Sequence, residues 1–171
     1  MSQKERLPEL GLGSIQDVFV REAFKLEGVL CVAYNGPERG INPGEGFDCS
    51  GFVSYVLDRI GISRIILEKG EEALARHCYQ YFDFFGVHIE PEERQRGDFV
   101  FFSWHGNLPQ HMGILVSERA YIHALLKTEE VSISALKFGE IIPGQKTQLP
   151  QKYLISPIGF KRLFPLSETE K

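Results

Sequence analysis

Long apolar segments are missing from this sequence. Among its 171 residues there is no apolar run long enough to cross a bilayer as a helix, which takes about 20 residues. Residues 1–8 are mostly polar and lack the apolar core of a secretory signal peptide. We therefore expect no membrane span and a cytoplasmic location.

Cysteine and basic residues are also scarce. The three cysteines, Cys31, Cys49 and Cys78, are odd in number, form no CxxC motif and stand at no zinc-finger spacing from histidines. We therefore expect reduced thiols and no disulfide framework. The net charge of −4 and the pI near 5.8 indicate no basic surface for nucleic acid or an anionic membrane, so neither is expected as a partner.

The composition is that of a globular protein, with 43% hydrophobic and 25% charged residues, and the length suits one domain. Pro8, Gly11 and Gly13 break any periodicity near the start of the chain. We expect a polar lead-in over 1–13, a single domain over 14–164 and a polar tail over 165–171.

The residues around Cys49 predict a helix that begins at this cysteine. Asp48 is a favoured N-cap residue, apolar residues then recur at helical spacing, and Gly61 suits the position after the helix end. Free N–H groups at a helix N-terminus favour a thiolate and can bind an oxyanion, so Asp48 and Ser50 flank a candidate oxyanion site. A free cysteine considered alone more often fills a core, so the assignment depends on other residues.

Periodicity and turn residues predict the other elements. We expect one helix over 14–28, capped by Ser14, and another over 70–85, where apolar residues recur at steps of three and four. His77 and Cys78 are neighbours in the second of these helices and point about 100° apart, so we interpret them as packing residues. Runs of β-branched and aromatic residues predict strands over 98–102, 112–116, 120–124, 131–134, 153–156 and 158–163.

His111 and His123 flank the predicted hairpin over 112–124. If its pairing is centred on a residue of the turn, positions of equal parity share a face of the sheet, so the two odd-numbered histidines lie together. One imidazole can then act as a base toward Cys49 while the other orients that base. A metal pair is the alternative, but no further ligands follow at suitable spacing, and we expect no metal.

Four sequence blocks resemble, in order and spacing, the NlpC-type family of papain-like cell-wall cysteine peptidases. The blocks cover residues 47–53, 96–102, 111–114 and 121–124. The resemblance implies an α+β fold with a papain-like NlpC-type core, in which the nucleophile helix packs on an antiparallel β-sheet. It also implies Cys49 as the nucleophile, His111 as the general base and His123 as the third, orienting residue.

The same resemblance implies a function. Members of this family cleave an amide bond in peptidoglycan stem peptides, often the γ-D-glutamyl bond to a diamino acid, and they need no cofactor. We therefore expect a cysteine peptidase whose partner is a stem peptide or a wall fragment. Delivery to the wall would then use a non-Sec route, such as a secretion or phage machinery.

Tyr34, Trp104 and His105 are candidate substrate-binding residues. The family's approach segment carries a Tyr followed by Trp-Gly-Gly, whereas here Tyr34 is followed by Asn35-Gly36. Tyr34 is then either the aromatic of the substrate cleft or a half-buried packing residue. Trp104 and His105 precede His111 in a turn-forming loop, where binding residues concentrate, although an exposed loop residue needs no special role.

Two other functions fit part of the pattern. A papain-like thiol acyltransferase or amidase would act on a non-wall substrate, but acyltransferases of the lecithin:retinol type place the histidine before the cysteine, and here the cysteine comes first. A non-catalytic module would bind wall fragments. Such a module would be free to lose Cys49, His111 and His123, all of which are present.

Overall fold

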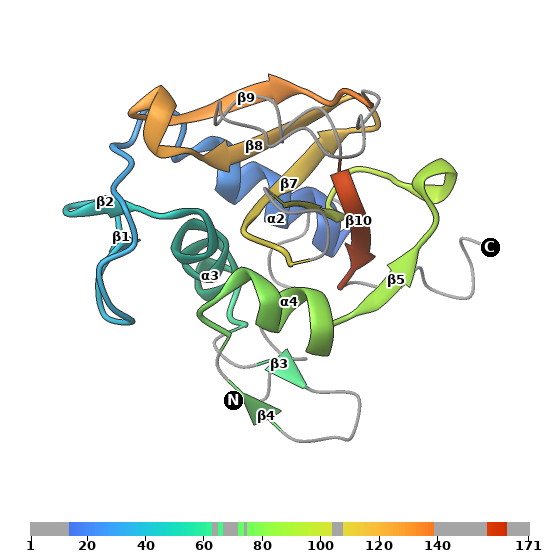
Figure 1. Cartoon of the computed structure of the whole chain (residues 1–171), viewed down its shortest axis with the longest axis horizontal. Helices are drawn as coiled ribbons and strands as arrows, with labels where there is room; N and C mark the ends of the chain where they lie inside the picture. Colours follow the sequence, from blue (N-terminus) through green and yellow to red (C-terminus); the bar gives the residue numbers. More distant parts are fainter. Residues whose placement is uncertain are drawn as a thin grey trace.

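The centre of the computed structural model is a six-stranded antiparallel sheet (Figure 1). The structure describes residues 14–62, 65–66, 72–73, 75–103, 108–138 and 157–163. The strands follow in the order β5 (Val87–Ile89), β10 (Pro157–Arg162), β6 (Phe99–Phe102), β7 (His111–Ser117), β8 (Ala120–Ala124) and β9 (Val131–Ala135). Each neighbouring pair is antiparallel. The expected α+β fold is confirmed.

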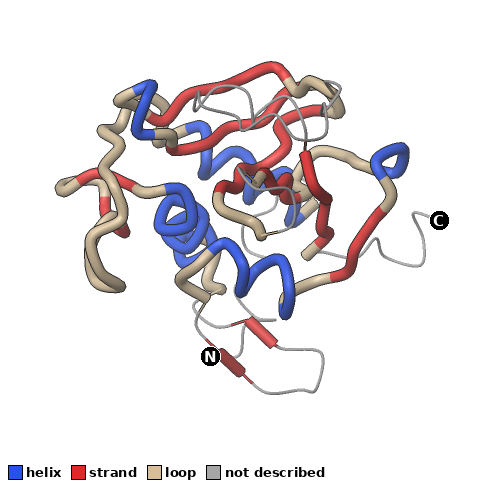
Figure 2. Tube along the Cα trace, in the orientation of Figure 1, coloured by secondary structure: helices blue, strands red, loops and turns tan. Residues whose placement is uncertain are grey.

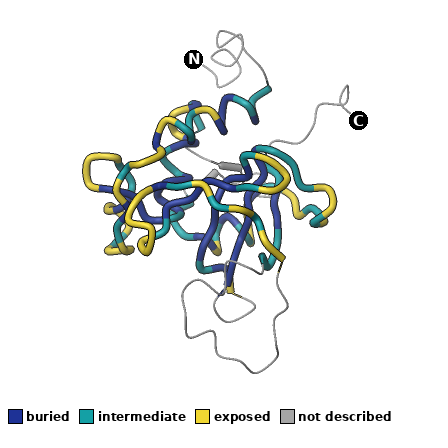
Figure 3. Tube along the Cα trace, turned by 90° about the horizontal axis from the view of Figure 1, so that it is seen from above, coloured by how far each residue is buried: buried dark blue, intermediate teal, exposed yellow. Residues whose placement is uncertain are grey.

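Helices α2 (Ile15–Phe24) and α3 (Cys49–Arg59) pack against β7 and form the main core with it (Figures 1 and 2). Phe19 of α2, Val53 of α3 and Ile114 of β7 are all completely buried in this core. Figure 3 shows the buried segments gathered at the centre and the exposed ones in the outer loops. The start of α3 is therefore anchored to the sheet by the apolar face of the helix.

The two faces of the sheet carry different residues. In the β7–β8 hairpin Ile114 pairs with Ile122 and Leu115 with Tyr121, so the pairing is centred on position 118. Even-numbered residues such as Ile114 face the helices. Odd-numbered residues of this hairpin, such as Leu115 and Tyr121, face the other side, where they form a second apolar cluster with Val100 and Phe102 of β6 and Phe160 of β10. Equal parity therefore puts His111 and His123 on one face, as expected.

The helix predicted over 70–85 is wrong in its first half. Glu72–Ala73 form strand β4, which pairs with β3 (Ile65–Ile66), and helix α4 spans only Cys78–Phe84. The side chain of Gln80 accepts hydrogen bonds from the N–H groups of Arg76 and His77 at 2.8 and 2.9 Å, which fixes the start of α4. The spacing of apolar side chains could not reveal this, because the pairing of β3 with β4 is made by backbone groups and leaves no mark in the pattern of side chains.

The helix predicted over 14–28 is shorter than expected. Ser14 caps it by accepting a hydrogen bond from Asp17 N–H at 3.3 Å, but α2 ends at Phe24. A turn then leads to Gly28, whose positive φ of 85° only glycine adopts readily. The chain reverses there and pairs through Leu30 with Glu130.

The remaining described elements are short. A two-stranded ribbon, β1 (Ile41–Asn42) and β2 (Gly46–Phe47), leads into α3, and 3-10 turns occupy Pro91–Glu93 and Leu126–Thr128. No helix among the described residues is long and apolar enough to cross a membrane. The strand expected over 153–156, the lead-in and the tail lie outside the described residues, so the domain limits stay a prediction.

Candidate active site

Asp48 determines where α3 begins. Its backbone is extended (φ −89°, ψ 173°), and its Oδ1 accepts a hydrogen bond from Gly51 N–H at 2.8 Å. The helix ends at Arg59, and Gly61 follows with a positive φ of 83°. The predicted helix is confirmed, and Cys49 is its first residue, where backbone N–H groups have no acceptor within the helix.

Arg76 holds the Asp48 carboxylate in place. Its Nη1 donates to Asp48 Oδ1 at 3.0 Å, and its Nη2 donates to Asp48 Oδ2. The side chains of Arg76 and Asp48 are only 13% and 7% exposed, so this ion pair is largely shielded from water. Ser50 Oγ donates to the Arg76 carbonyl oxygen at 2.6 Å. The side chains of Asp48 and Ser50 therefore fix the start of the helix.

Glycine is required at Gly51 for a steric reason. A Cβ there would overlap the carbonyl oxygen of Gly40, which belongs to the loop that crosses the start of α3. Gly40 in turn has a φ of 71°, a conformation that glycine adopts readily because it has no side chain. In this conformation its carbonyl oxygen accepts a hydrogen bond from Asp48 N–H at 3.0 Å. The Cys-Ser-Gly order thus allows the loop to close on the helix beside the thiol.

His111 and His123 form a hydrogen-bonded pair. Nε2 of His111 lies 2.7 Å from Nδ1 of His123, and Nε2 of His123 lies 2.9 Å from Ser134 Oγ. Both rings are buried, with 3% and 0% exposure. Burial, and then the nearby charge of His111, lowers the pKa of His123 well below its usual range. His123 is therefore neutral, so its Nδ1 can accept a hydrogen bond from His111 while its Nε2–H donates one to Ser134.

Gly113 makes room for this pair. It lies opposite His123 across the hairpin, since 114 pairs with 122. A Cβ at Gly113 would lie 2.9 Å from the Ile122 carbonyl oxygen and 3.2 Å from the His123 Cβ. The absence of a side chain at Gly113 lets the two histidine rings meet along one face of the sheet.

Cys49 lies beside a second thiol. Its Sγ is 3.3 Å from the Sγ of Cys78 and 3.9 Å from the carbonyl oxygen of Gln110, the residue before β7. The pKa of Cys49 lies well below its usual range, because the Cys78 thiol hydrogen-bonds to it and because His111 contributes a hydrogen bond and positive charge, against the opposing effect of burial. Cys49 is thus set up to be a thiolate.

Cys78 remains a thiol beside this thiolate. Its pKa is raised well above its usual range, first because it donates to Cys49 and then because it is buried. Cys78 is buried in the main core, as expected of a packing residue, and its thiol also contacts Cys49. The sequence did not predict this contact because it placed Cys78 inside a longer helix, whereas α4 begins at Cys78 and turns its first residue toward Cys49.

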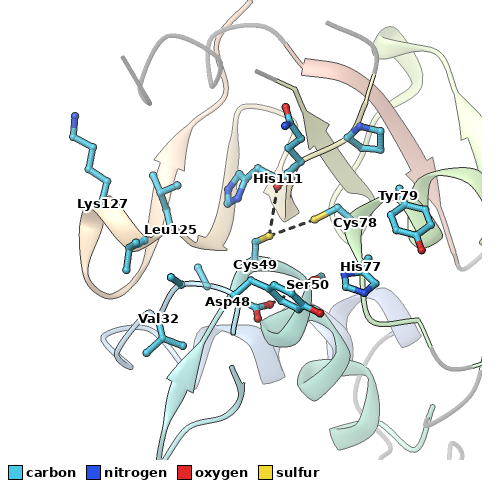
Figure 4. Close-up of a pocket in the computed structure, with 16 residues that line it drawn as sticks. Val32, Asp48, Cys49, Ser50, His77, Cys78, Tyr79, His111, Leu125 and Lys127 are labelled. Atoms are coloured by element: carbon cyan, nitrogen blue, oxygen red, sulfur yellow. Dashed lines mark hydrogen bonds between the residues drawn. The ribbon is translucent and has the colours of Figure 1, made fainter. Parts of the chain in front are cut away.

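Cys49 opens into a pocket of about 650 Å³ (Figure 4). Figure 4 shows His111, Cys78 and Cys49 around the same space, with His77 and Tyr79 on the side of α4 and Leu125 and Lys127 on the side that follows β8. The other residues that line the pocket are Val32, Ala33, Tyr34, Asp48, Ser50, Pro109, Gln110, Ala124 and Leu126. A pocket of this size is in the range that encloses small-molecule and peptide ligands.

Comparison with known proteins identifies the family. The model of the NlpC/P60 family matches residues 33–142, which is more than half of the chain. The chain belongs to the NlpC/P60 family. The matched region contains Cys49, His111 and His123, together with Cys78 and Ser134.

Several curated relatives are similar to this NlpC/P60 chain. Peptidoglycan endopeptidase RipB of Mycobacterium tuberculosis (strain ATCC 25618 / H37Rv) is 28% identical over 111 residues, 63% of this chain and 41% of RipB. Probable peptidoglycan endopeptidase LytE of Bacillus subtilis (strain 168) is 35% identical over 91 residues, 53% of this chain and 23% of LytE. The chain therefore matches less than half the length of these relatives.

Solved structures share the fold. One is a lipoprotein-like protein of the NLP/P60 family from Staphylococcus aureus subsp. aureus Mu50. It superposes with a TM-score of 0.61 at 25% identity, over 88% of this chain and 42% of that chain. RipB from Mycobacterium tuberculosis gives a TM-score of 0.60 at 22% identity, over 96% of this chain and 80% of that chain. The antiparallel sheet with packed helices is thus the NlpC/P60 architecture.

The structure places some of the residues predicted for the NlpC/P60 site together, and others lie outside the described residues. The structure brings Cys49 and His111 together, and it puts His123 behind His111. Tyr34 lines the pocket, is 51% exposed and lies 5.2 Å from the ring of His77. Trp104 and His105 lie outside the described residues.

Three residues of the site were missed from the sequence. Ser134 has the spacing of an ordinary strand residue, and both Arg76 and Cys78 fall inside the helix predicted over 70–85. Each reaches the site only because distant segments pack together, so no local pattern identifies them. Among the described residues, no three His, Cys, Asp or Glu side chains gather in an arrangement that suits a metal ion, and we assign no metal ligand.

Proposed function

We propose that this chain is a cysteine peptidase that hydrolyses an amide bond in peptidoglycan stem peptides, with the γ-D-glutamyl bond to a diamino acid as the bond cleaved. The observation that carries the proposal is the line of side chains at the pocket. The Cys49 thiol interacts with His111, and His111 Nε2 lies 2.7 Å from His123 Nδ1. The names of RipB and LytE as peptidoglycan endopeptidases support the class of substrate.

Acylation begins at the Cys49 thiolate. Its sulfur attacks the carbonyl carbon, a C–S bond forms, and the carbonyl electron pair moves to the oxygen. Backbone N–H groups at the start of α3 stabilise this oxyanion, each well-aimed donor contributing on the order of 3 kcal/mol. His111 then gives a proton to the amine nitrogen, and the C–N bond breaks. The lowered pKa of Cys49 supports this step because it favours the ionised sulfur over the thiol.

Deacylation returns the site to its starting state. A water molecule gives a proton to His111 and attacks the thioester carbonyl, and the C–S bond breaks to release the acid and the Cys49 thiolate. His111 therefore acts as acid in the first half and as base in the second. No other group needs to change its protonation state.

His123 acts by orienting His111. Because His123 is neutral and buried, its Nδ1 accepts from His111 Nε2–H, which leaves the other nitrogen of His111 for Cys49. Ser134 accepts from His123 Nε2–H at 2.9 Å and so selects this tautomer. We assign His123 and Ser134 as positioning residues on these contacts.

The pocket supports binding of a short peptide next to Cys49. Tyr34 is proposed to contact the substrate because it lines this pocket and is 51% exposed. Trp104 and His105 stay predictions for the same role. The partner proposed for the pocket is a free stem peptide or a wall fragment that carries one.

Digestion of purified peptidoglycan and of defined stem peptides, followed by mass spectrometry of the products, tests the proposal. Wild-type protein is expected to release fragments cut at the γ-D-glutamyl bond, and Cys49→Ser to release none. Cys31→Ser is the matched control, because Cys31 lies in the core away from the pocket lining and is 4% exposed. Cleavage by Cys49→Ser at the wild-type rate would refute the peptidase. Transfer of the acyl group to an added amine would favour an acyltransferase, and binding without cleavage by wild type would favour a binding module.

A further inference from the structure

A second thiol adjoins the proposed nucleophile, and none of its own bonds is made or broken in the proposed amide hydrolysis. The Sγ atoms of Cys49 and Cys78 are 3.3 Å apart, although the residues are 29 positions apart in the sequence. Both line the same pocket (Figure 4). The third cysteine, Cys31, is not part of the pocket lining.

The two sulfur atoms are close enough to bond after a small movement. A disulfide has an S–S length of about 2.05 Å, so the sulfurs at 3.3 Å must approach by about 1.2 Å. Each sulfur turns about a single side-chain torsion, χ1, and each cysteine is the first residue of its helix, α3 or α4. Rotation of the side chains can therefore supply much of the movement.

The two thiols differ in access and in ionisation. Cys49 is partly exposed to the pocket, whereas Cys78 is 7% exposed. The pKa of Cys49 is lowered and that of Cys78 is raised, since the thiol of Cys78 donates to the thiolate of Cys49. A small oxidant that enters the pocket therefore meets the more reactive sulfur first, and the protected thiol lies directly behind it.

We propose that Cys49 and Cys78 form a two-thiol oxidation site that takes a hydroperoxide and closes into a reversible disulfide. The loss of activity on closure rests on the peptidase function proposed above, whereas the disulfide itself does not. Closure uses the nucleophile as one of the bonded atoms, so an oxidised site cannot attack an amide.

The chemistry takes two steps. The Cys49 thiolate attacks the outer oxygen of the hydroperoxide, an S–O bond forms, the O–O bond breaks, and the alkoxide or hydroxide leaves and takes a proton from water. The sulfur of Cys78 then attacks the Cys49 sulfenic acid, the S–S bond forms, the S–O bond breaks, and the departing oxygen leaves as water with the thiol proton of Cys78. Two electrons pass from the thiols to the hydroperoxide, and a small dithiol returns them by thiol–disulfide exchange.

Mass spectrometry of the oxidised full chain tests the disulfide directly. Wild-type protein is treated with hydrogen peroxide, the remaining thiols are blocked, and the protein is digested with trypsin. The expected product is a cross-link between the peptides 40–59 and 77–94, which contain Cys49 and Cys78, with the loss of two hydrogen atoms. Cys31, in the peptide 26–39, is expected to stay a thiol, since burial raises its pKa to about 11.

Activity measurements test reversibility. Peroxide is expected to remove the activity of wild type, and dithiothreitol to restore it. Cys78→Ser is compared with its own untreated activity and is expected to lose it irreversibly, because Cys49 then oxidises to the sulfinic acid without a resolving thiol. Cys31→Ala is the matched control and is expected to behave as wild type in both measurements. Circular dichroism establishes that each variant is folded.

Two results would overturn the proposal. One is oxidised wild type that carries Cys49 sulfinic acid and no peptide cross-link. The other is a Cys78→Ser protein that dithiothreitol reactivates as fully as wild type. A cross-link in a protein that cleaves no stem peptide would instead reject the proposed function and leave the oxidation site standing.

Discussion

Replacement of Asp48 by asparagine is expected to lower the free energy of unfolding by about 3 kcal/mol. Asparagine keeps an oxygen that can accept from Gly51 N–H, so the helix cap survives and mainly the negative charge is lost. Arg76 then has a guanidinium that is 13% exposed and has no carboxylate. Removal of one partner of a buried ion pair costs about 3–5 kcal/mol, against at most about 1 kcal/mol at an exposed pair.

The lower end of that range applies because Arg76 keeps neutral acceptors. Its side chain also donates to the carbonyl oxygens of Pro37 and Arg39, at 2.9 and 2.6 Å, and to Ser50 Oγ at 3.1 Å. In a chain of this length about 1 kcal/mol corresponds to roughly 2–4 °C, so the midpoint of thermal unfolding is expected to fall by about 6–12 °C. Asp48→Ala, which also removes the cap, is expected to cost about 1 kcal/mol more.

Urea and thermal unfolding of matched variants measure this effect. Asp17→Asn is the control, because the Arg96–Asp17 pair is open to water, with side chains 41% and 49% exposed. Its expected cost is below about 1 kcal/mol. The double variant Asp48→Asn with Arg76→Gln is expected to cost less than the sum of the single changes, since it removes both charges. Equal costs for Asp48→Asn and Asp17→Asn would refute the assignment of Asp48–Arg76 as a shielded pair.

Four further results are expected. At mildly acidic pH, iodoacetamide is expected to label Cys49 faster than the other two cysteines, because the lowered pKa of Cys49 keeps more thiolate; equal rates would exclude activation. His111→Ala is expected to lose as much stem-peptide cleavage as Cys49→Ser, whereas His123→Ala retains part of it, which rates at saturating substrate would measure. As pH falls below about 6.5, His123 binds a proton in the unfolded chain but not in the folded chain, because burial lowers its pKa in the folded state. The free energy of unfolding is therefore expected to drop by up to about 1.4 kcal/mol per pH unit. His123→Asn is expected to reduce that slope, which urea titrations at several pH values would measure. Gly113→Ala is expected to destabilise the hairpin by about 1–3 kcal/mol because its Cβ would lie 2.9 Å from a carbonyl oxygen, and an unchanged midpoint of unfolding would contradict this.

Local sequence determined the elements whose interactions span only a few residues. The helix that begins at Cys49 was predictable because its cap, its apolar spacing and its closing glycine all lie within residues 48–61. The meeting of His111 and His123 was predictable in the same way, since the parity of a hairpin depends only on where its short turn lies. The resemblance in these blocks then sufficed for the family, which the comparisons confirm.

The helix expected over 70–85 shows where local reasoning failed. Apolar spacing favours a helix throughout that segment, but hydrogen bonds between Glu72–Ala73 and Ile65–Ile66 form a strand pair instead. The backbone can satisfy its hydrogen bonds in either way. Contacts outside the segment decide between them, and periodicity does not record those contacts.

The tertiary structure alone decided what surrounds the thiol of Cys49. Cys78 lies 29 positions away in the sequence, and Arg76 lies 28 positions from Asp48, yet each makes a direct contact at the start of α3. These contacts form because the apolar faces of the helices are buried against the sheet, and burial depends on the total apolar area covered rather than on the identity of a particular polar neighbour. Packing therefore determines which polar groups come into contact, and the linear pattern of apolar residues does not predict those contacts.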